Sequence, residues 1–386
     1  MPNSLVSLGE IVDVFSGFAW KAAKFNNEGN GVPVIRIQNI GQPDSGFVYW
    51  DEQYQDRFLV NQGDVLLSLS GSFRITVWDG PTGLLNQRVV KLTPRDGLDV
   101  GYFRHFMQTQ LREIEAMGRH ALVNNVSVAD LKNIQIPLPP YPEQRRIAAI
   151  LDKADALLIR RRAASAKLDR LLQSVFLEMF GDPVTNPKEW PDTTRLGEIA
   201  DICSGITKGR KTTSEIRSVP YLAVANVQDR HLKLENVKTI EATEQEINRY
   251  KLLTNDLLLT EGGDPDKLGR GALWDASIPD CIHQNHVFRV RITSSAINPI
   301  FLNWLVGSAR GKRYFLGVAK QTTGIASINM TQLKNFPLLT PPVDLQELFA
   351  VRVSRIESHR EMLDSAENSA GDFFKSLQQQ AFEGNL

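Results

Sequence analysis

The chain has 386 residues, of which 42% are hydrophobic and 23% are charged. These values are ordinary for globular proteins and exclude a disordered, collagen-like or purely coiled-coil chain, while the length predicts about two or three domains. The two cysteines are too few for a disulfide framework, and no apolar run approaches the ~18 residues of a membrane span, so we expect a cytoplasmic protein.

The charge is balanced overall but unevenly distributed. Basic and acidic residues number 44 each, which by itself argues against a nucleic-acid partner, because phosphate binding needs a basic surface. By segment, however, the net charge is −2 over 1–142, +3 over 143–181, +3 over 182–342 and −4 over 343–386. A local basic patch is therefore compatible with the overall neutrality.

An internal repeat is the strongest pattern in the sequence. A first set of stretches, VSLGEIVDVFSGF (6–18), GVPVIRIQNI (31–40), QGDVLLSLSG (62–71) and VSVADLKNIQIPLPPYPEQ (126–144), matches in the same order TRLGEIADICSGI (194–206), SVPYLAVANV (218–227), TNDLLLTEGG (254–263) and INMTQLKNFPLLTPPVDLQ (328–346). NQRVVKLT (86–93) more loosely resembles the stretch that begins at His283. One unit of roughly 190–200 residues therefore occurs twice.

Each copy predicts a mixed α+β domain. Short strand-like runs alternate with Gly-rich turns, a helix follows at about 100–116 and again at about 298–314, and a short strand ends in prolines. Proline fits the first turn of a helix, so these prolines mark the starts of two long helices. We predict a first globular domain at 1–142, a long helix at 143–181, a second globular domain at 182–342 and a second long helix at 343–386.

The two long helices carry apolar seams. Glu143 to Phe180 contains neither Pro nor Gly, and Gly181 offers a C-cap. Steps of four and three residues give two seams, eight of ten positions apolar in each: Ile147, Leu151, Ala154, Leu158, Arg161, Ser165, Leu168, Leu172, Val175 and Met179, then Leu345, Phe349, Arg352, Ile356, His359, Leu363, Ala366, Ala370, Phe373 and Leu377. This period of 3.5 is typical of coiled coils.

We expect the helices to pair with each other, because the first is net basic and the second net acidic. An antiparallel pair places the two domains roughly 50 Å apart, at 1.5 Å per residue. The alternative, in which each helix packs only on its own domain, stays open. Arg161, Ser165, Arg352 and His359 are polar seam positions that either fix the register or loosen the seam locally.

No catalytic, metal or cofactor site is predicted. Leu138-Pro139-Pro140-Tyr141 resembles the loop of amino-methyltransferases but lacks its Asn or Asp, and the glycines after Gly205 and Gly262 depart from phosphate-loop and dinucleotide spacings. Cys281, His283 and His286 lack a fourth metal ligand and do not share one face of a strand.

The loops of both copies carry the residue types that read base edges and phosphates, although each is individually also typical of a solvated loop. The candidates for DNA binding are Lys21, Lys24, Arg36, Gln38, Asn39, Ser72, Arg74, Gln87 and Arg88 in the first copy, and Thr207, Lys208, Arg210, Lys211, Asn226, Gln228, His283, Gln284 and Asn285 in the second, with Ser16, Phe18, Trp20 and Ser204 beside them. Lys208, Arg210 and Lys211 form the best candidate for phosphate.

The order of these motifs resembles a known family. LGE…SG, VP followed by a strand, GDVLL…G, and LKN…PLPPYPEQRRI before a long helix, used twice, are similar to the specificity subunit of type I restriction-modification enzymes. The resemblance implies a non-catalytic chain in which two target recognition domains each read half of a split DNA site. It also implies that the helices set the spacer and dock two modification subunits, which methylate adenine N6 using S-adenosylmethionine, while separate ATP-dependent restriction subunits cut.

Two further expectations follow. In the second copy Asp344-Leu345-Gln346-Glu347 departs from the pattern around Glu143-Gln144, so its contacts at the helix start should differ. The nearly neutral domains predict that the isolated chain binds DNA weakly. The rival functions are a DNA-binding adaptor or repressor without methyltransferase partners, a single-chain restriction-methyltransferase, and a structural scaffold.

Overall fold

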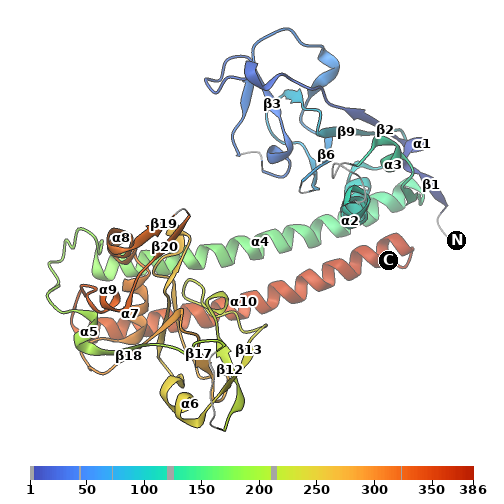
Figure 1. The fold of residues 1–386 in the computed structure, drawn as a ribbon. Coiled ribbons are helices and arrows are strands. Elements are labelled where there is room, and N and C mark those ends of the chain that lie inside the picture. The colour runs from blue at the N-terminus through green and yellow to red at the C-terminus, as the bar shows by residue number, and fades with distance from the viewer. Residues whose placement is uncertain (1–3, 43–44, 72, 120–125, 210–214, 323) are drawn as a thin grey trace. The chain divides into compact units, whose positions relative to one another are not determined.

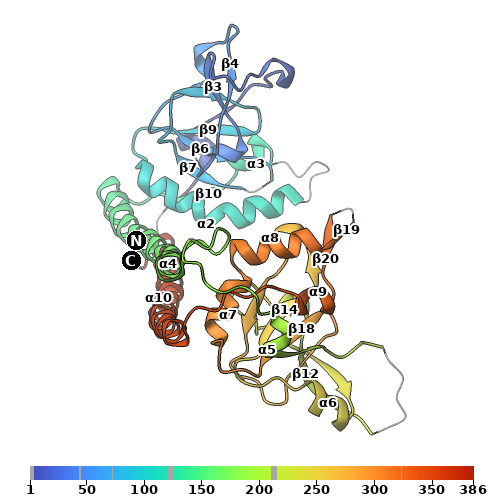
Figure 2. The same cartoon turned by 90° about the vertical axis from the view of Figure 1, so that its left-hand side faces the viewer.

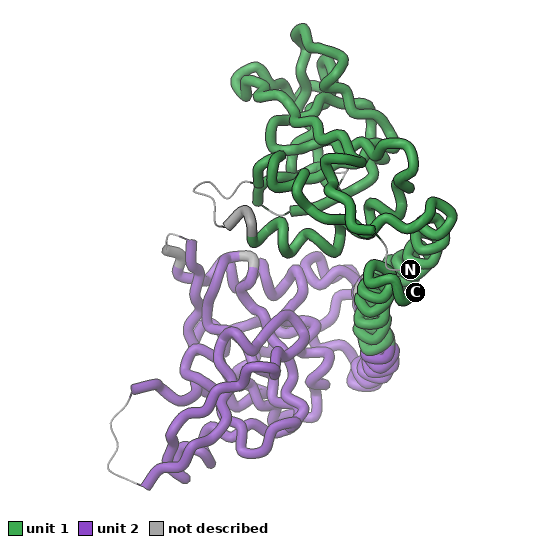
Figure 3. The backbone as a smooth tube through the Cα atoms, turned by 90° about the vertical axis from the view of Figure 1, so that its right-hand side faces the viewer, with its two compact units in different colours: residues 1–164, 363–386 green, residues 165–362 purple. Residues whose placement is uncertain are grey.

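The computed structural model describes residues 4–42, 45–71, 73–119, 126–209, 215–322 and 324–386. The chain forms two compact units, one of residues 1–164 with 363–386 and the other of residues 165–362 (Figure 3). Each unit mixes helices and sheets, so the predicted α+β class is confirmed. No helix in the described ranges is long and apolar enough to cross a membrane.

The first unit contains two four-stranded sheets, ordered β2-β9-β6-β7 and β4-β3-β8-β5, and a short pairing of β1 with β10 (Figure 1). Helix α2 (Val100–Arg119) packs against the first of these sheets, and its Tyr102 and Phe103 share a core with Leu67 and Leu92 (Figure 2). The strands are β1 (Leu5–Ser7), β2 (Val12–Ser16), β3 (Val32–Ile35), β4 (Val48–Trp50), β5 (Leu59–Val60), β6 (Val65–Ser68), β7 (Ile75–Val77), β8 (Gly83–Leu85), β9 (Val89–Pro94) and β10 (Gln135–Pro137).

The second unit repeats this topology. Its sheet β11-β18-β14-β16 has the strand order of β2-β9-β6-β7, and β13-β12-β17 has that of β4-β3-β8, including the parallel pairing at the centre. A three-stranded sheet, β15-β20-β19, has no counterpart in the described part of the first unit. The strands are β11 (Ala200–Ser204), β12 (Arg217–Leu222), β13 (Lys238–Ala242), β14 (Leu257–Thr260), β15 (Gly262–Gly263), β16 (Gly271–Leu273), β17 (Ile282–His283), β18 (Val287–Ile292), β19 (Lys320–Thr322) and β20 (Ile325–Ser327).

The short helices also correspond, with one exception. The sequence LGEI forms both α1 (Leu8–Ile11) and α5 (Leu196–Ile199), and α3 (Val128–Lys132) corresponds to α9 (Met330–Lys334). The single helix predicted at about 298–314 is wrong, because the chain forms α7 (Pro299–Val306) and α8 (Ala309–Val318). The chain turns so tightly between them that a Cβ atom on Gly311 would lie 1.8 Å from the Val306 carbonyl oxygen.

Both long helices begin at the proline clusters, as predicted. They are α4 (Tyr141–Phe180) and α10 (Val343–Glu383), and the C-cap prediction for α4 is confirmed, because Gly181 has a φ of +79° and its N–H donates to the Leu177 carbonyl oxygen at 2.8 Å. The remaining helices are α6 (Glu244–Tyr250) and the 3-10 turns η1 (Ala22–Lys24), η2 (Ile37–Asn39), η3 (Asp56–Phe58), η4 (Val224–Asn226) and η5 (Pro265–Lys267).

The predicted difference between the two helix starts is wrong. The buried Gln144 amide accepts from the Asp99 backbone N–H at 2.8 Å and donates to the Gly97 and Pro139 carbonyl oxygens at 3.0 and 2.9 Å. Gln346 makes the same three bonds, accepting from Asn298 N–H at 2.9 Å and donating to the Ala296 and Pro341 carbonyl oxygens at 3.1 and 2.7 Å. The two glutamines are equivalent once the proline pairs are aligned.

The long helices pair antiparallel within each unit. In the first unit, Arg161 Nη1 donates to the Ala366 carbonyl oxygen at 2.6 Å, and Arg146 Nη2 donates to the carbonyl oxygen of Leu386 at 2.7 Å. In the second unit, the rings of Phe176 and Phe349 lie 5.5 Å apart. Arg161 therefore faces the partner helix as predicted, while its role in fixing the register stays a prediction.

The predicted seam of the second helix is partly wrong. Arg352 and His359 are exposed, and Phe373 is 62% exposed, whereas the neighbouring Val353 and Phe374 pack into the cores. An α-helix has about 3.6 residues per turn, so a strict 3.5-residue walk drifts around it. The predicted apolar face is correct at Phe349 and Ala366. At Arg352 and Phe373, the residue that packs into the core is instead the next one along the chain.

Candidate nucleic-acid interface

In each unit, loops from the two sheets are tied together by backbone hydrogen bonds. We call residues 16–20, 36–42, 69–71, 73–74 and 86–88 the first rim, and residues 204–208, 223–233, 261–270 and 284–286 the second rim. In the first rim, Gln87 N–H donates to the Phe18 carbonyl oxygen at 2.9 Å and Leu69 N–H to that of Arg88 at 2.9 Å.

The second rim has the same bonds at equivalent positions. Asn285 N–H donates to the Ile206 carbonyl oxygen at 3.0 Å, and Glu261 N–H donates to that of His286 at 3.0 Å. These bonds pair Phe18 with Ile206, Leu69 with Glu261, and Arg88 with His286 as equivalent positions. The two rims therefore share one backbone arrangement and differ in side chains.

The repeated Ser-Gly dipeptide explains how one loop reaches the next. A Cβ atom on Gly17 would lie 2.2 Å from the Asn86 carbonyl oxygen, and one on Gly205 would lie 1.9 Å from that of His283. Only glycine permits this close approach of two backbones. The residue after each glycine, Phe18 or Ile206, is thereby fixed against the turn that follows β8 or β17.

An arginine occupies the same place in both rims. The Arg74 carbonyl oxygen accepts from Ser68 N–H at 3.0 Å, and the Arg270 carbonyl oxygen accepts from Thr260 N–H at 3.1 Å. Arg270 Nη1 also donates to Gln228 Oε1 at 3.0 Å, which fixes the guanidinium at the loop after η4. Gly41 occupies the corresponding loop of the first rim, where a Cβ atom would lie 3.9 Å from Arg74 Cδ.

Most of the predicted residues of the first rim reach the surface. Arg36 and Arg74 are half-buried, and Lys24 pairs with Glu52 at 2.7 Å, so its charge is already partly compensated. Trp20 is buried in an aromatic cluster with Trp50 and Phe58. The exposed residues are Ser16, Phe18, Lys21, Lys24, Gln38, Gln87 and Arg88.

The second rim is more polar and less basic in the part that the structure describes. Lys208 is exposed, and its Nζ lies 5.0 Å from the centroid of the Tyr221 ring. Thr207 is exposed, and Ser204, Gln228, Gln284 and Asn285 are half-buried. Ser72, Arg210 and Lys211 lie outside the described residues, so of the predicted phosphate cluster only Lys208 can be placed.

Three of the predicted DNA-binding residues use polar side-chain atoms for hydrogen bonds inside the fold. The buried Asn39 accepts from Arg36 N–H at 2.9 Å and donates to the Gly46 carbonyl oxygen at 3.0 Å. Asn226 repeats this arrangement with Ala223 and Lys233, at 2.9 and 2.8 Å. Because these side chains hold the rim loops in shape, we leave both out of the surface proposed below.

His283 is the third predicted DNA-binding residue that bonds inside the fold. It is fully buried and its Nδ1 lies 2.8 Å from the Val287 carbonyl oxygen. Burial lowers the pKa of His283 to about 4, so the ring is neutral at physiological pH. It therefore offers no charge for DNA in this conformation.

Sequence reasoning missed Glu261, Arg270 and His286. The sequence comparison aligned Asn86, which follows β8, with His283. The hydrogen bonds instead show that residues 86–88 are equivalent to residues 284–286. The shift by one residue made His283 the counterpart of Asn86 in place of Gln284, and Asn285 the counterpart of Arg88 in place of His286. The paired turns Gln87-Arg88-Val89 and Asn285-His286-Val287 were the available signal.

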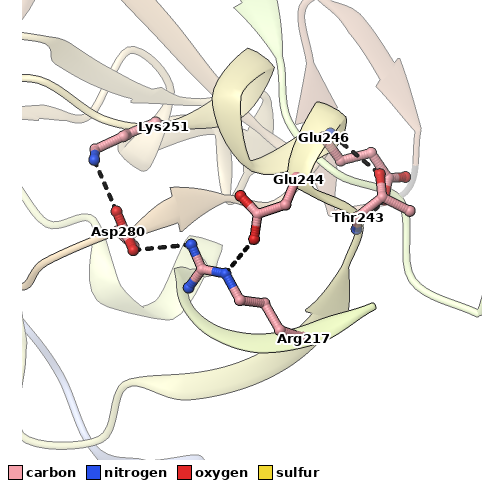
Figure 4. A network of polar contacts seen from close by, with 6 residues as sticks. All are labelled: Arg217, Thr243, Glu244, Glu246, Lys251 and Asp280. Carbon is pink, nitrogen blue, oxygen red and sulfur yellow. Dashed lines mark hydrogen bonds and ion pairs between the residues drawn. The ribbon is translucent and has the colours of Figure 1, made fainter. Parts of the chain in front are cut away.

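A separate basic side chain in the second unit is fully engaged in ion pairs. Arg217, at the start of β12, lies between Glu244 and Asp280, and Lys251 Nζ donates to Asp280 Oδ1 at 2.7 Å (Figure 4). Hydrogen bonds from Lys251 and Arg217 lower the pKa of Asp280. This network joins the start of β12 to α6 and to the loop before β17, and it carries no uncompensated positive charge.

No metal-binding group of three or more His, Cys, Asp or Glu side chains occurs in the described ranges. Cys281 is buried, and this burial raises the pKa of its thiol to about 12, so it is a poor metal ligand and a poor nucleophile.

Sequence comparisons relate the chain to proteins of type I restriction systems. A family model described as the type I restriction modification DNA specificity domain matches residues 3–168. The chain is 24% identical to the type I restriction enzyme EcoBI specificity subunit of Escherichia coli, across 99% of this chain and 85% of that one. It is 25% identical to the StySPI specificity subunit of Salmonella potsdam, across 76% of this chain and 67% of that one.

The chain is thus similar, over nearly its whole length, to a type I restriction enzyme specificity subunit. Solved structures agree at the level of the fold. The S subunit of a type I restriction-modification system from M. genitalium superposes with a TM-score of 0.59 at 15% identity, covering 98% of this chain and 96% of that one. A chain from a study of complex assembly in the type I R-M system gives 0.54 at 16% identity, covering 100% and 98%. The family model ends near the middle of this chain, and the sheet order of the first unit recurs in the second unit.

Proposed function

We propose that this chain is the DNA-recognition subunit of a type I restriction-modification complex, with the first rim reading one half of a split site and the second rim the other. The observation that carries the proposal is one loop arrangement built twice, with Arg74 and Arg270 at equivalent places and different side chains around them. Arginine is the commonest reader of guanine in the major groove. Arg36, Gln38, Gln87 and Arg88 would contribute in the first rim, and Lys208, Gln228, Gln284 and Asn285 in the second.

The helix pair is proposed to set the spacer and to dock two modification subunits. Exposed apolar side chains on the outer faces support this role, since such patches commonly mark protein interfaces. In the first unit these are Leu157 and Ile159, and in the second unit Leu348, Val351 and Met362. Methylation by those partners and ATP-dependent cleavage by restriction subunits are part of the same proposal, as is a cytoplasmic location beside the DNA.

Charge supports a further part of the proposal. Because each recognition domain is nearly neutral, few phosphates can be neutralised by this chain alone, so its DNA affinity should be low. The modification subunits would supply much of the phosphate contact. Tight, sequence-specific DNA binding by the purified chain would contradict this point.

The direct test is a genome-wide methylation map. The chain is co-expressed with the modification subunit encoded beside it in a host that lacks DNA methylation. The proposal predicts methylated adenines in a split motif, two short half-sites with a fixed spacer, that disappears without this chain. Soluble, copurifying proteins that produce no methylation would favour the adaptor or repressor, for which the relatives give no support.

A further inference from the structure

The second rim contains a short relay of polar side chains that no sequence motif indicated. His286 Nδ1 lies 2.6 Å from Glu261 Oε2, and Asn285 Nδ2 lies 3.5 Å from His286 Nε2. Because a carboxylate only accepts hydrogen bonds, Nδ1 carries the proton and donates to Glu261. The Asn285 amide lies against the other ring nitrogen, Nε2, so the relay holds Glu261 from one side.

The relay opens onto a pocket. This pocket has a volume of about 530 Å³, and its wall includes Glu261, His286, Val224 and Ile325. The Glu261 side chain is 33% exposed and that of His286 is 57% exposed, so both remain accessible. The β20 side of the pocket comes from the small sheet β15-β20-β19, which the described part of the first unit lacks.

The corresponding positions of the first rim have opposite chemistry. Leu69 takes the place of Glu261, and Arg88 takes the place of His286. The first rim therefore has a buried leucine where the second has a carboxylate, and a guanidinium where the second has an imidazole. The phosphates of DNA repel a carboxylate, so a carboxylate on a DNA-reading surface gains energy only from a donor on a base. The donors in the major groove are the exocyclic amino groups of cytosine and adenine.

We propose that Glu261, positioned by His286, reads an exocyclic amino group in the half-site of the second recognition domain. This inference rests on the proposed function. Cytosine N4 is the usual partner of a carboxylate, and adenine N6 offers the same N–H donor. Glu261 touches the base in this account, whereas His286 is a positioning residue.

The test uses the methylation map with the full chain and its modification subunit. Glu261→Ala should relax one base pair of the second half-site, with about a tenfold or greater loss of discrimination there, and should leave the first half-site unchanged. A relaxed G·C pair assigns cytosine as the ligand, and a relaxed A·T pair assigns adenine. His286→Ala should weaken discrimination at that same base pair, which a purely structural defect would not do selectively.

Two further variants keep the test decisive. Glu235→Gln is the control, because Glu235 is an exposed acid of the same unit that lies outside the second rim, and it should leave the motif unchanged. Glu261→Gln preserves the shape of the side chain in case the alanine variant does not fold, and it should alter the same base pair. Both Glu261 variants giving the wild-type motif would overturn the inference. A wild-type chain that produces no split motif would instead overturn the proposed function.

Discussion

The two rims use one backbone arrangement to present different chemistry. In the first, Phe18 is 47% exposed between rim loops that carry Gln87 and Arg88, whereas its counterpart Ile206 is 1% exposed. In the second, Glu261 and His286 replace Leu69 and Arg88. The glycine at each Ser-Gly and the buried asparagines Asn39 and Asn226 fix where the loops stand. The fold thus determines the positions of the reading side chains, and the loop residues determine what can be read.

The parts that hold the scaffold differ much less between the copies. Gln144 and Gln346 make the same three hydrogen bonds, and both are buried. Equivalent positions of the two copies therefore fall into two classes: those with the same side chain and the same hydrogen bonds, and those whose side chains differ. Each prediction below tests one side of this division.

The largest expected effect is on the shared scaffold. Gln144→Ala and Gln346→Ala should each lower the free energy of unfolding by about 2–4 kcal/mol, because each leaves a buried backbone N–H and two carbonyl oxygens without a partner. Chemical denaturation of the full chain measures this. Gln173→Ala on the exposed face of α4 is the control and should change little. A large loss at one glutamine and none at the other would break the equivalence of the two helix starts.

The next effect distinguishes the two copies by the pH dependence of their stability. Burial lowers the pKa of His283 to about 4, below its unfolded value near 6.5, so the unfolded chain binds a proton more readily between these values. Stability should therefore fall as the pH drops from 7 to 5, by about 1–2 kcal/mol from this group. His283→Leu introduces the residue that the first copy has at the equivalent position, Leu85. It should remove the part of the pH-dependent loss of stability that His283 causes.

The free energy of unfolding of the wild type and of His283→Leu, measured at pH 7, 6 and 5, checks whether stability falls as the pH drops. Burial also lowers the pKa of His105, so the variant should retain some acid sensitivity from the first unit. Identical pH dependence of the two chains would show that His283 does not titrate as its environment implies.

A smaller effect concerns the exposed aromatic ring of the first rim. The Phe18 ring is held by Trp20 and Phe58, with centroids 4.8 and 5.3 Å away, and is positioned for apolar contact with a base edge or a thymine methyl group. Phe18→Ile should reduce discrimination at one base pair of the first half-site by about 1 kcal/mol, or roughly fivefold. In the methylation map the second half-site should remain intact, and Tyr54→Ala, another exposed aromatic of this unit, should have no effect.

The smallest effect is expected outside the rims. Arg217→Ala breaks exposed ion pairs with Glu244 and Asp280, and such pairs contribute little to stability. The melting temperature should barely change, and the methylated motif should not change at all. A relaxed half-site in this variant would show that the reading surface extends to the β12–α6 edge.

Features with a local or periodic signal were predictable from sequence. The duplication, the proline-marked starts of α4 and α10 and the Gly181 cap follow from residue type and spacing. The break between α7 and α8 was not predictable, because it depends on a close approach at Gly311. The exposed Arg352 and the buried Val353 reflect the drift of a real helix from a 3.5-residue repeat. The match of Asn86 to His283 was one residue out, because strand register is fixed by pairing across the sheet rather than by the local sequence.

The most direct test of the central claim compares Arg74→Ala with Arg270→Ala in the methylation map. The two arginines hold equivalent places in the two rims, and each should read its own half-site. We predict that Arg74→Ala relaxes a base pair in one half-site only and Arg270→Ala a base pair in the other half-site only, with the spacer unchanged. Both variants altering the same half-site, or both weakening methylation uniformly without relaxing any position, would contradict two independent readers built on one scaffold.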